Sequence, residues 1–92
     1  MPRFYIEIPH EAETIACLRA VRVLQDTGSH LLTHADYGCY DGDHTARIVV
    51  EVDTKTDALM MVPPVYRPKA RVIQLNSFSR EEIDELMKKH SG

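Results

Sequence analysis

Three histidines and one cysteine fall within a stretch of fifteen residues, and side chains of these types could bind a transition metal. They are His30, His34, Cys39 and His44. Thiolate sulfur and imidazole nitrogen are common protein ligands of zinc, nickel and copper ions. One hypothesis is therefore a protein that binds Ni, Zn or Cu through its histidines and Cys39.

The chain around these residues is expected to form a β-hairpin, which decides which side chains can meet. Asp41-Gly42 lies between two strand-like runs, and an Asp-Gly pair favours a two-residue type I′ turn, because both central residues of that turn have positive φ. Counting outward from this turn predicts the cross-strand pairs Cys39–His44, Asp36–Arg47, His34–Val49 and His30–Asp53.

Strand geometry restricts the metal hypothesis to few of these ligands. On an extended strand His30 and His34 are about 13 Å apart at roughly 3.3 Å per residue, too far to share an ion held at about 2 Å. His34 and Cys39 have opposite parity and face opposite sides unless a bulge intervenes at Gly38. Cys39 and His44 are therefore the candidate metal pair, with His30 as a weaker third ligand. The alternative is a buried thiol beside a histidine at the sheet edge.

A second group could perform acid–base chemistry instead. His34, Asp36 and Arg47 are expected on one sheet face, with Asp36 and Arg47 directly opposed. His34 could act as a general base, Asp36 could orient it, and Arg47 could hold an anionic substrate. The competing interpretation is a cross-strand ion pair next to an interface histidine.

Other segments predict the elements around the hairpin. Residues 3–8 alternate as a strand with Phe4, Ile6 and Ile8 on the buried face. Residues 11–26 have helical periodicity, and Gly28 is placed for a left-handed C-cap. Cys17 falls on the apolar stripe of this helix as a core residue, and His10 precedes it as a capping residue.

The second half of the chain predicts a short helix, a strand and a terminal helix. Residues 54–61 form the short helix, which Pro63-Pro64 stops, and residues 70–78 alternate again as a strand. A capping box at Ser79 to Glu82 begins a helix and tail over residues 79–92. Its apolar side chains, Ile83, Leu86 and Met87, are expected to dock it.

Length and composition limit the class of protein. The 92 residues suffice for a single domain over 1–92, and the net charge of −3 argues against nucleic-acid binding. There is no apolar run long enough to span a membrane and no signal-peptide pattern, so a cytoplasmic location with reduced thiols is expected.

The order of these elements predicts the fold. Strand, helix, strand, strand, helix, strand is the α+β, ferredoxin-like βαββαβ arrangement, here with an extra C-terminal helix. It would form a four-stranded antiparallel sheet with the helices on one face. The open face would carry His34, Asp36 and Arg47 and the candidate ligand-binding residues Tyr5, Glu7, Glu51, Gln74 and Asn76.

This order, the Asp-Gly hairpin and the helix stop at Pro63-Pro64 resemble small proteins of the dimeric α+β barrel superfamily. The resemblance implies a homodimer with a cavity between open sheet faces. It leaves two main hypotheses: a small-ligand-binding protein that uses this polar cavity, and a cofactor-free isomerase or monooxygenase-like enzyme with His34 as general base. Neither requires a cofactor, whereas the metal hypothesis requires a divalent transition metal.

Overall fold

A four-stranded antiparallel sheet organises the protein. A computed structural model describes residues 1–91, and Gly92, the end of the predicted tail, lies outside the described residues. The strands run in the order β2-β3-β1-β4. Their bounds are β1 Arg3–Pro9, β2 Asp36–Gly38, β3 Asp43–Glu51 and β4 Arg71–Leu75. The predicted α+β class with a four-stranded antiparallel sheet is confirmed.

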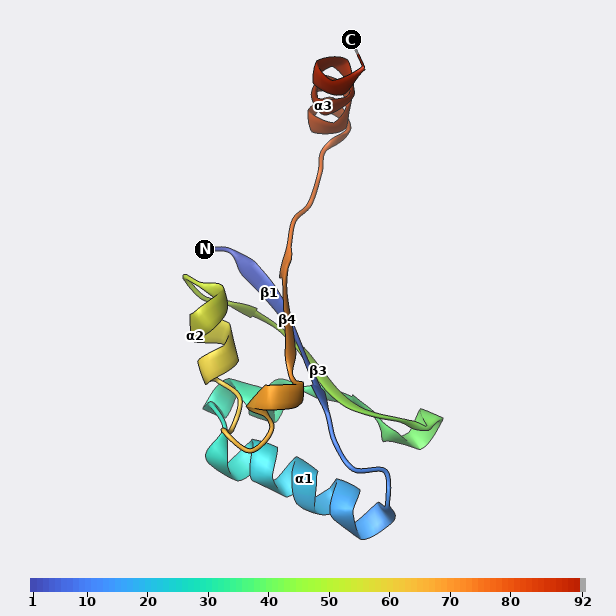
Figure 1. The fold of residues 1–92 in the computed structure, drawn as a ribbon, viewed down its shortest axis with the longest axis vertical. Coiled ribbons are helices and arrows are strands. Elements are labelled where there is room, and N and C mark those ends of the chain that lie inside the picture. Colours follow the sequence, from blue (N-terminus) through green and yellow to red (C-terminus); the bar gives the residue numbers. More distant parts are fainter. Residues whose placement is uncertain (92) are drawn as a thin grey trace.

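Three α-helices and three 3₁₀ turns accompany the sheet in residues 1–91. The helices are α1 Thr14–Thr27, α2 Lys55–Met60 and α3 Arg80–His90, and the 3₁₀ turns are η1 His30–His34, η2 Cys39–Asp41 and η3 Arg67–Lys69. Figure 1 shows α1 and α2 beside the strands and α3 at the far end of the molecule. None of the helices in the described part of the chain has the length and hydropathy of a membrane-spanning segment.

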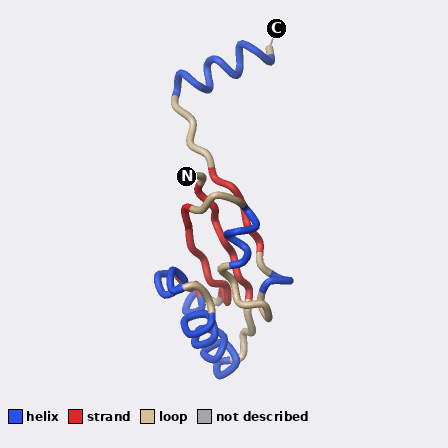
Figure 2. Tube along the Cα trace, turned by 90° about the vertical axis from the view of Figure 1, so that its left-hand side faces the viewer, coloured by secondary structure: helices blue, strands red, loops and turns tan. Residues whose placement is uncertain are grey.

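The core lies between one face of the sheet and the helices α1 and α2. Phe4, Ile6 and Ile8 are buried, which confirms the alternation predicted for β1. They pack with Leu24 of α1 and Ala58 of α2. Figure 2 shows the strands in red, with α1 below them and the C-terminal helix apart from them at the top. The rest of the core comprises Leu32, Ala46, Val50 and Val62.

The opposite face of the sheet carries an apolar row across three strands. Tyr5 of β1 pairs with Val49 of β3 and with Ile73 of β4, so these side chains share a face. One row that is wholly or mainly polar lies on each side of it: Arg47, Glu7 and Arg71 on one side, and Glu51, Arg3 and Leu75 on the other.

The face predicted for β4 is wrong. Gln74 was expected on the open face, but it pairs with Phe4 and therefore lies on the helix side, as does Val72, which pairs with Ile6. Both faces of this strand carry apolar residues, so alternation alone did not identify the inner one. Asn76, also expected on the open face, lies beyond the end of β4.

The first predicted strand of the hairpin is also shorter than expected. Residues 30–34 form η1, because local side-chain bonds favour a turn. The Ser29 hydroxyl accepts from the Leu31 N–H at 3.4 Å, and the Thr33 hydroxyl donates to the His30 carbonyl at 2.7 Å. The predicted pairs His34–Val49 and His30–Asp53 are therefore absent from the described sheet, whereas Asp36 does pair with Arg47.

The turn between β2 and β3 differs from the predicted type I′ turn. Gly42 is the only residue of 1–91 with positive φ, at 80°, whereas a type I′ turn needs two. Its N–H donates to the Cys39 carbonyl at 3.1 Å, which closes η2. Strand pairing ends with Gly38 opposite Asp43 after a register shift, so the predicted Cys39–His44 strand pair is replaced by a 3₁₀ turn at Cys39.

Close packing, rather than a left-handed backbone, explains Gly28 at the end of α1. Its φ of −82° is extended and contradicts the predicted left-handed cap. A Cβ atom there would lie 2.4 Å from Cδ1 of buried Leu32 and 2.8 Å from the Leu24 carbonyl oxygen. A larger residue would therefore require Leu32 and the end of α1 to shift, whereas glycine fits without such a shift.

The C-terminal helix forms as predicted but does not dock on its own domain. The capping box is present, with the Glu82 N–H donating to the Ser79 hydroxyl at 3.1 Å and the Ser79 N–H donating to the Glu82 carboxylate at 3.4 Å. No residue of α3 is buried. Ile83, Leu86 and Met87, expected to dock the helix, are all exposed.

Candidate metal centre

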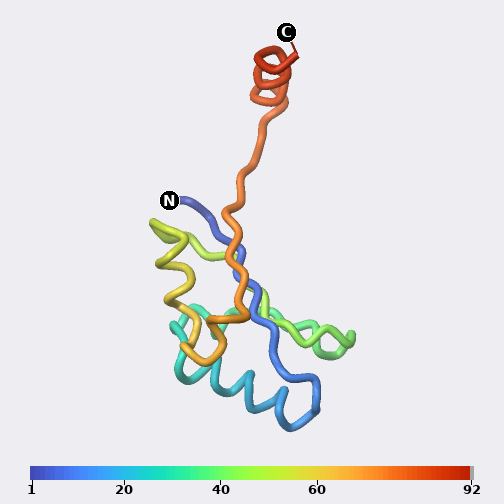
Figure 3. Tube along the Cα trace, viewed as in Figure 1, coloured from blue at the N-terminus to red at the C-terminus, as the bar shows by residue number. Residues whose placement is uncertain are grey.

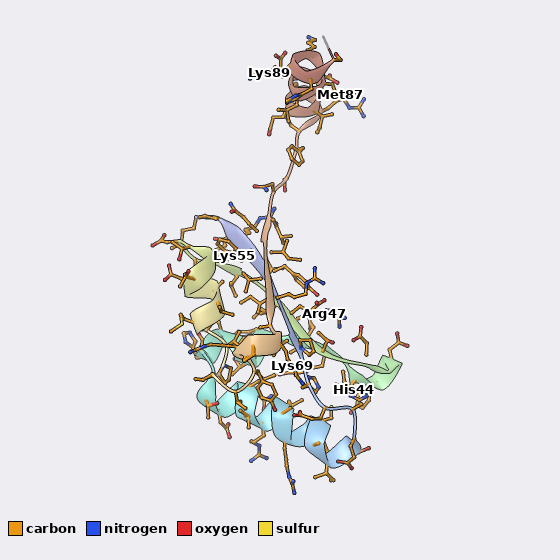
Figure 4. The ribbon with its side chains drawn as sticks, in the orientation of Figure 1. His44, Arg47, Lys55, Lys69, Met87 and Lys89 are labelled. Carbon is orange, nitrogen blue, oxygen red and sulfur yellow. The ribbon has the colours of Figure 1, made fainter. Side chains whose placement is uncertain are left out.

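Four potential metal ligands converge where the hairpin turn meets the start of α1. His10 lies in the connection from β1 to α1, Cys17 in the first turns of α1, Cys39 in η2 and His44 near the start of β3. The backbone helps to position them, since the His10 N–H donates to the His44 carbonyl at 3.0 Å. Figure 4 shows His44 on β3 near the N-terminal end of α1.

The donor atoms of these four side chains are close together. Cys17 Sγ lies 3.3 Å from Cys39 Sγ, 3.3 Å from His10 Nε2 and 3.3 Å from His44 Nδ1. Cys39 Sγ lies 3.4 Å from His10 Nε2. All four donor atoms are within 4.8 Å of one another, so one ion could contact each of them.

These separations fit a tetrahedral zinc ion closely. With Zn–S bonds of about 2.3 Å and Zn–N bonds of about 2.0 Å, tetrahedral angles place two sulfurs about 3.8 Å apart and a sulfur and a nitrogen about 3.5 Å apart. The sulfurs, at 3.3 Å, would separate by a few tenths of an ångström on binding, and His44 Nδ1, which is within 4.8 Å of Cys39 Sγ and of His10 Nε2, would complete the shell. Two thiolates and two imidazoles are also a donor set that favours zinc.

The centre is partly shielded from water. Cys17 is 5% exposed, and the other three ligands are half-buried. Burial, together with the hydrogen bond and charge of Cys39, raises the pKa of the Cys17 thiol to about 11. A pocket of about 190 Å³ beside the cluster, lined in part by Thr14, Cys17, Cys39 and His44, leaves a route for an ion from solvent.

Aromatic rings pack around the histidines. The ring centroids of His10 and His44 are 6.1 Å apart at 86°, and those of His10 and Tyr37 are 6.1 Å apart at 67°. Burial raises the pKa of the Tyr37 hydroxyl. His10 Nδ1 and the Tyr37 hydroxyl are buried without a hydrogen-bond partner. An ion on His10 Nε2 would leave a proton on Nδ1. Metal-bound histidines usually donate this second ring N–H to an acceptor, and His10 has none in the described structure.

The sequence-based metal candidates are divided by the structure. Cys39 and His44 belong to the cluster, whereas His30 is exposed on η1 and lies outside it. His10 and Cys17 were interpreted as a capping residue and a core residue, so half of the cluster was missed. The available signal was the pair of short spacings, His10 to Cys17 and Cys39 to His44, each across a turn or helix start.

The candidate acid–base group is only partly assembled. His34 and Asp36 both line an open groove of about 580 Å³ beside β3. Arg47 pairs with Asp36 in the ladder, but its guanidinium donates to the Asp43 carboxylate instead. This bond lowers the pKa of Asp43. Within residues 1–91, no hydrogen bond joins His34, Asp36 and Arg47 to one another.

Of the remaining open-face candidates, Tyr5 and Glu7 bond to each other within β1, and Glu7 also bonds to Arg71 of β4. Glu7 accepts from the Tyr5 hydroxyl at 3.2 Å and from Arg71 at 3.3 Å. Glu51 is exposed opposite Arg3. Gln74 lies on the helix side of the sheet and Asn76 in the linker, so the five candidates do not all lie on one face of the sheet.

Comparison with protein-family models, curated proteins and solved structures found no match for the chain. The interpretation of the centre therefore depends on its own geometry.

Proposed function

We propose that the protein binds one zinc ion through His10, Cys17, Cys39 and His44, and that the ion joins the hairpin turn to α1. The observation that carries this proposal is the convergence of two sulfurs and two nitrogens within 4.8 Å. Four protein ligands complete a tetrahedral shell and leave no open position for a substrate, which is typical of structural zinc sites. The proposed role of the ion is thus to hold the fold.

Cobalt and zinc binding to the purified protein test this proposal. Cobalt(II) in a tetrahedral site with thiolate ligands has intense visible absorption, and zinc should displace it at a ratio of one ion per chain. We expect Cys17→Ser and His10→Ala to weaken zinc binding by more than about 100-fold, because even residues that only orient metal ligands contribute about 10- to 100-fold.

A matched histidine variant provides the control. His30→Ala removes an exposed histidine of the same stretch that lies outside the cluster, so it should bind zinc like the wild type. The proposed centre would be contradicted if His30→Ala and His10→Ala lost zinc affinity equally, or if the wild type gave no tetrahedral cobalt spectrum.

We also propose that the domain is ferredoxin-like, in the manner of dimeric α+β barrel proteins, with a second copy as the partner of its open sheet face. In support, β3 separates β1 from β2 and β1 separates β3 from β4, so both strand–helix–strand units are split. The apolar row Tyr5, Val49 and Ile73 on the face opposite the core offers a surface for that partner.

A further inference from the structure

The C-terminal helix and the open sheet face are two apolar surfaces of one chain that do not contact each other. On α3, Ile83, Leu86 and Met87 recur at spacings of three and four residues and form one stripe. Leu86 is 40% exposed and Met87 is 65% exposed. An isolated helix of 11 residues is marginal in water, so α3 needs a packing partner to remain folded.

The linker directs α3 away from its own sheet. Residues 76–79 continue beyond β4, and Figure 3 shows the chain running from β4 to α3 without turning back. The Arg3 guanidinium donates to the Ser77 hydroxyl at 2.9 Å, which holds the linker beside the start of β1. Figure 4 shows Met87 on α3 far from the sheet. Docking on the same chain would require this linker to reverse.

The open face has room for the apolar stripe of α3 and has arginines beside that room. The stripe from Ile83 to Met87 extends about 6 Å along the helix axis at about 1.5 Å per residue, and the row crosses three strands about 4.8 Å apart, or about 10 Å, so the row is long enough to hold the stripe. Val49 is 51% exposed and Ile73 is 37% exposed, on either side of Tyr5. Four of the first six residues of α3 are acidic, and three arginines stand in the rows that flank the apolar row, beside Glu7 and Glu51. The acidic residues are Glu81, Glu82, Asp84 and Glu85, and the arginines are Arg3, Arg47 and Arg71.

We infer that two copies of the chain exchange their C-terminal helices, so that the Ile83, Leu86 and Met87 stripe of each covers the Tyr5, Val49 and Ile73 row of the other. This inference rests on the proposed pairing of two copies and is independent of the metal centre. It adds α3 of the second copy to the surface that covers the open face.

Two variants, each altering one side of the contact, test the exchange. Leu86→Asp alters the helix stripe and Val49→Asp alters the sheet row, and both positions are exposed in the single chain, so both variants should fold. In sedimentation equilibrium we expect each homodimer to dissociate at least about tenfold more readily than the wild type, because a carboxylate enters an apolar contact. Met60→Asp, an exposed apolar residue on α2, should leave the association unchanged.

Mixing the two variants is the decisive measurement. A heterodimer keeps one intact contact, in which the helix of Val49→Asp covers the face of Leu86→Asp, whereas each homodimer has none. The mixture should therefore form dimers at concentrations where each variant alone is monomeric. Circular dichroism of each variant checks its fold.

Three outcomes would overturn the exchange, and they separate it from the proposed pairing. A monomeric wild type, with α3 either free or folded onto its own sheet, would contradict both the helix exchange and the proposed pairing of two copies. A Leu86→Asp variant that dimerises like the wild type would leave paired sheets but exclude α3 from the interface. An unrescued mixture would show that helix and row do not contact each other.

Discussion

The Cys17 thiol connects metal binding to pH. In the metal-free protein its pKa is raised to about 11, so the thiol holds its proton throughout the neutral range. Zinc binds the thiolate and must displace that proton. We expect zinc affinity to rise by roughly tenfold per pH unit for each thiol proton displaced between about pH 6 and 8. Titrations against a competing chelator measure this slope, and a flat profile would contradict thiolate binding.

The distance between the two sulfurs makes a second prediction for the metal-free protein. Cys17 Sγ and Cys39 Sγ are 3.3 Å apart, and both thiols are free. Hydrogen peroxide should join them in a disulfide, with two thiol hydrogens and one peroxide converted to two waters. Intact mass should fall by two hydrogens, and bound zinc should slow the reaction. Cys39→Ser cannot form the bond, and oxygen addition to separate sulfurs in the wild type would contradict it.

Only two of the four ligands could be predicted from the sequence, because the two pairs of ligands meet through tertiary packing. Cys39 and His44 flank one turn, so local geometry was enough to pair them. His10 and Cys17 are 29 and 22 residues from Cys39 and belong to another element. Their patterns, an apolar helix stripe and a residue after a strand, also fit ordinary structural roles.

Among the elements, the junction between α1 and η1 depends on Gly28. An alanine Cβ would meet Leu32 Cδ1 at 2.4 Å and the Leu24 carbonyl oxygen at 2.8 Å, and Leu32 is buried. We expect Gly28→Ala to lower the free energy of unfolding by about 1–3 kcal/mol, as overpacking does. Urea unfolding measures the change.

Gly42 offers the matched comparison for that substitution. Its φ is 80°, and a Cβ there would meet nothing within 4 Å. Gly42→Asn should lower the free energy of unfolding less than Gly28→Ala does, because asparagine tolerates the left-handed region and no neighbour must move. A larger loss at Gly42 would show that backbone conformation, rather than close packing, governs these glycines.

The elements themselves were predicted best where one local signal dominated. The alternation of Phe4, Ile6 and Ile8 and the capping box at Ser79 both specify a single structure. The segment from Ser29 to His34 carried competing signals, because its alternation suggested a strand while Ser29 and Thr33 could bond to the local backbone. The inner face of β4 depended on its register with β1, which no local pattern specifies.

For the whole molecule, zinc should account for a large share of stability. An ion that binds only the folded chain stabilises it by about 4.1 kcal/mol at a free concentration about 1,000 times its dissociation constant. For a domain of this size that corresponds to a melting temperature more than about 15 °C higher. Calorimetry with zinc and with a chelator measures the shift. Zinc should not shift the melting temperature of Cys17→Ser. A shift as large as in the wild type would place the stabilising ion elsewhere.

The four ligands all lie between residues 10 and 44, while β4, the linker and α3 have no part in the centre. Loss of the ion would therefore loosen the start of α1 and the turn at Tyr40, whose side chain is fully exposed, and leave the pairing of β1 with β4 intact. A protease that cuts after aromatic residues would then cleave at that turn in the metal-free chain and not in the zinc-bound chain, whereas cleavage after the exposed linker residue Phe78 would occur in both. The amount of available zinc would then determine how long the polypeptide resists proteolysis.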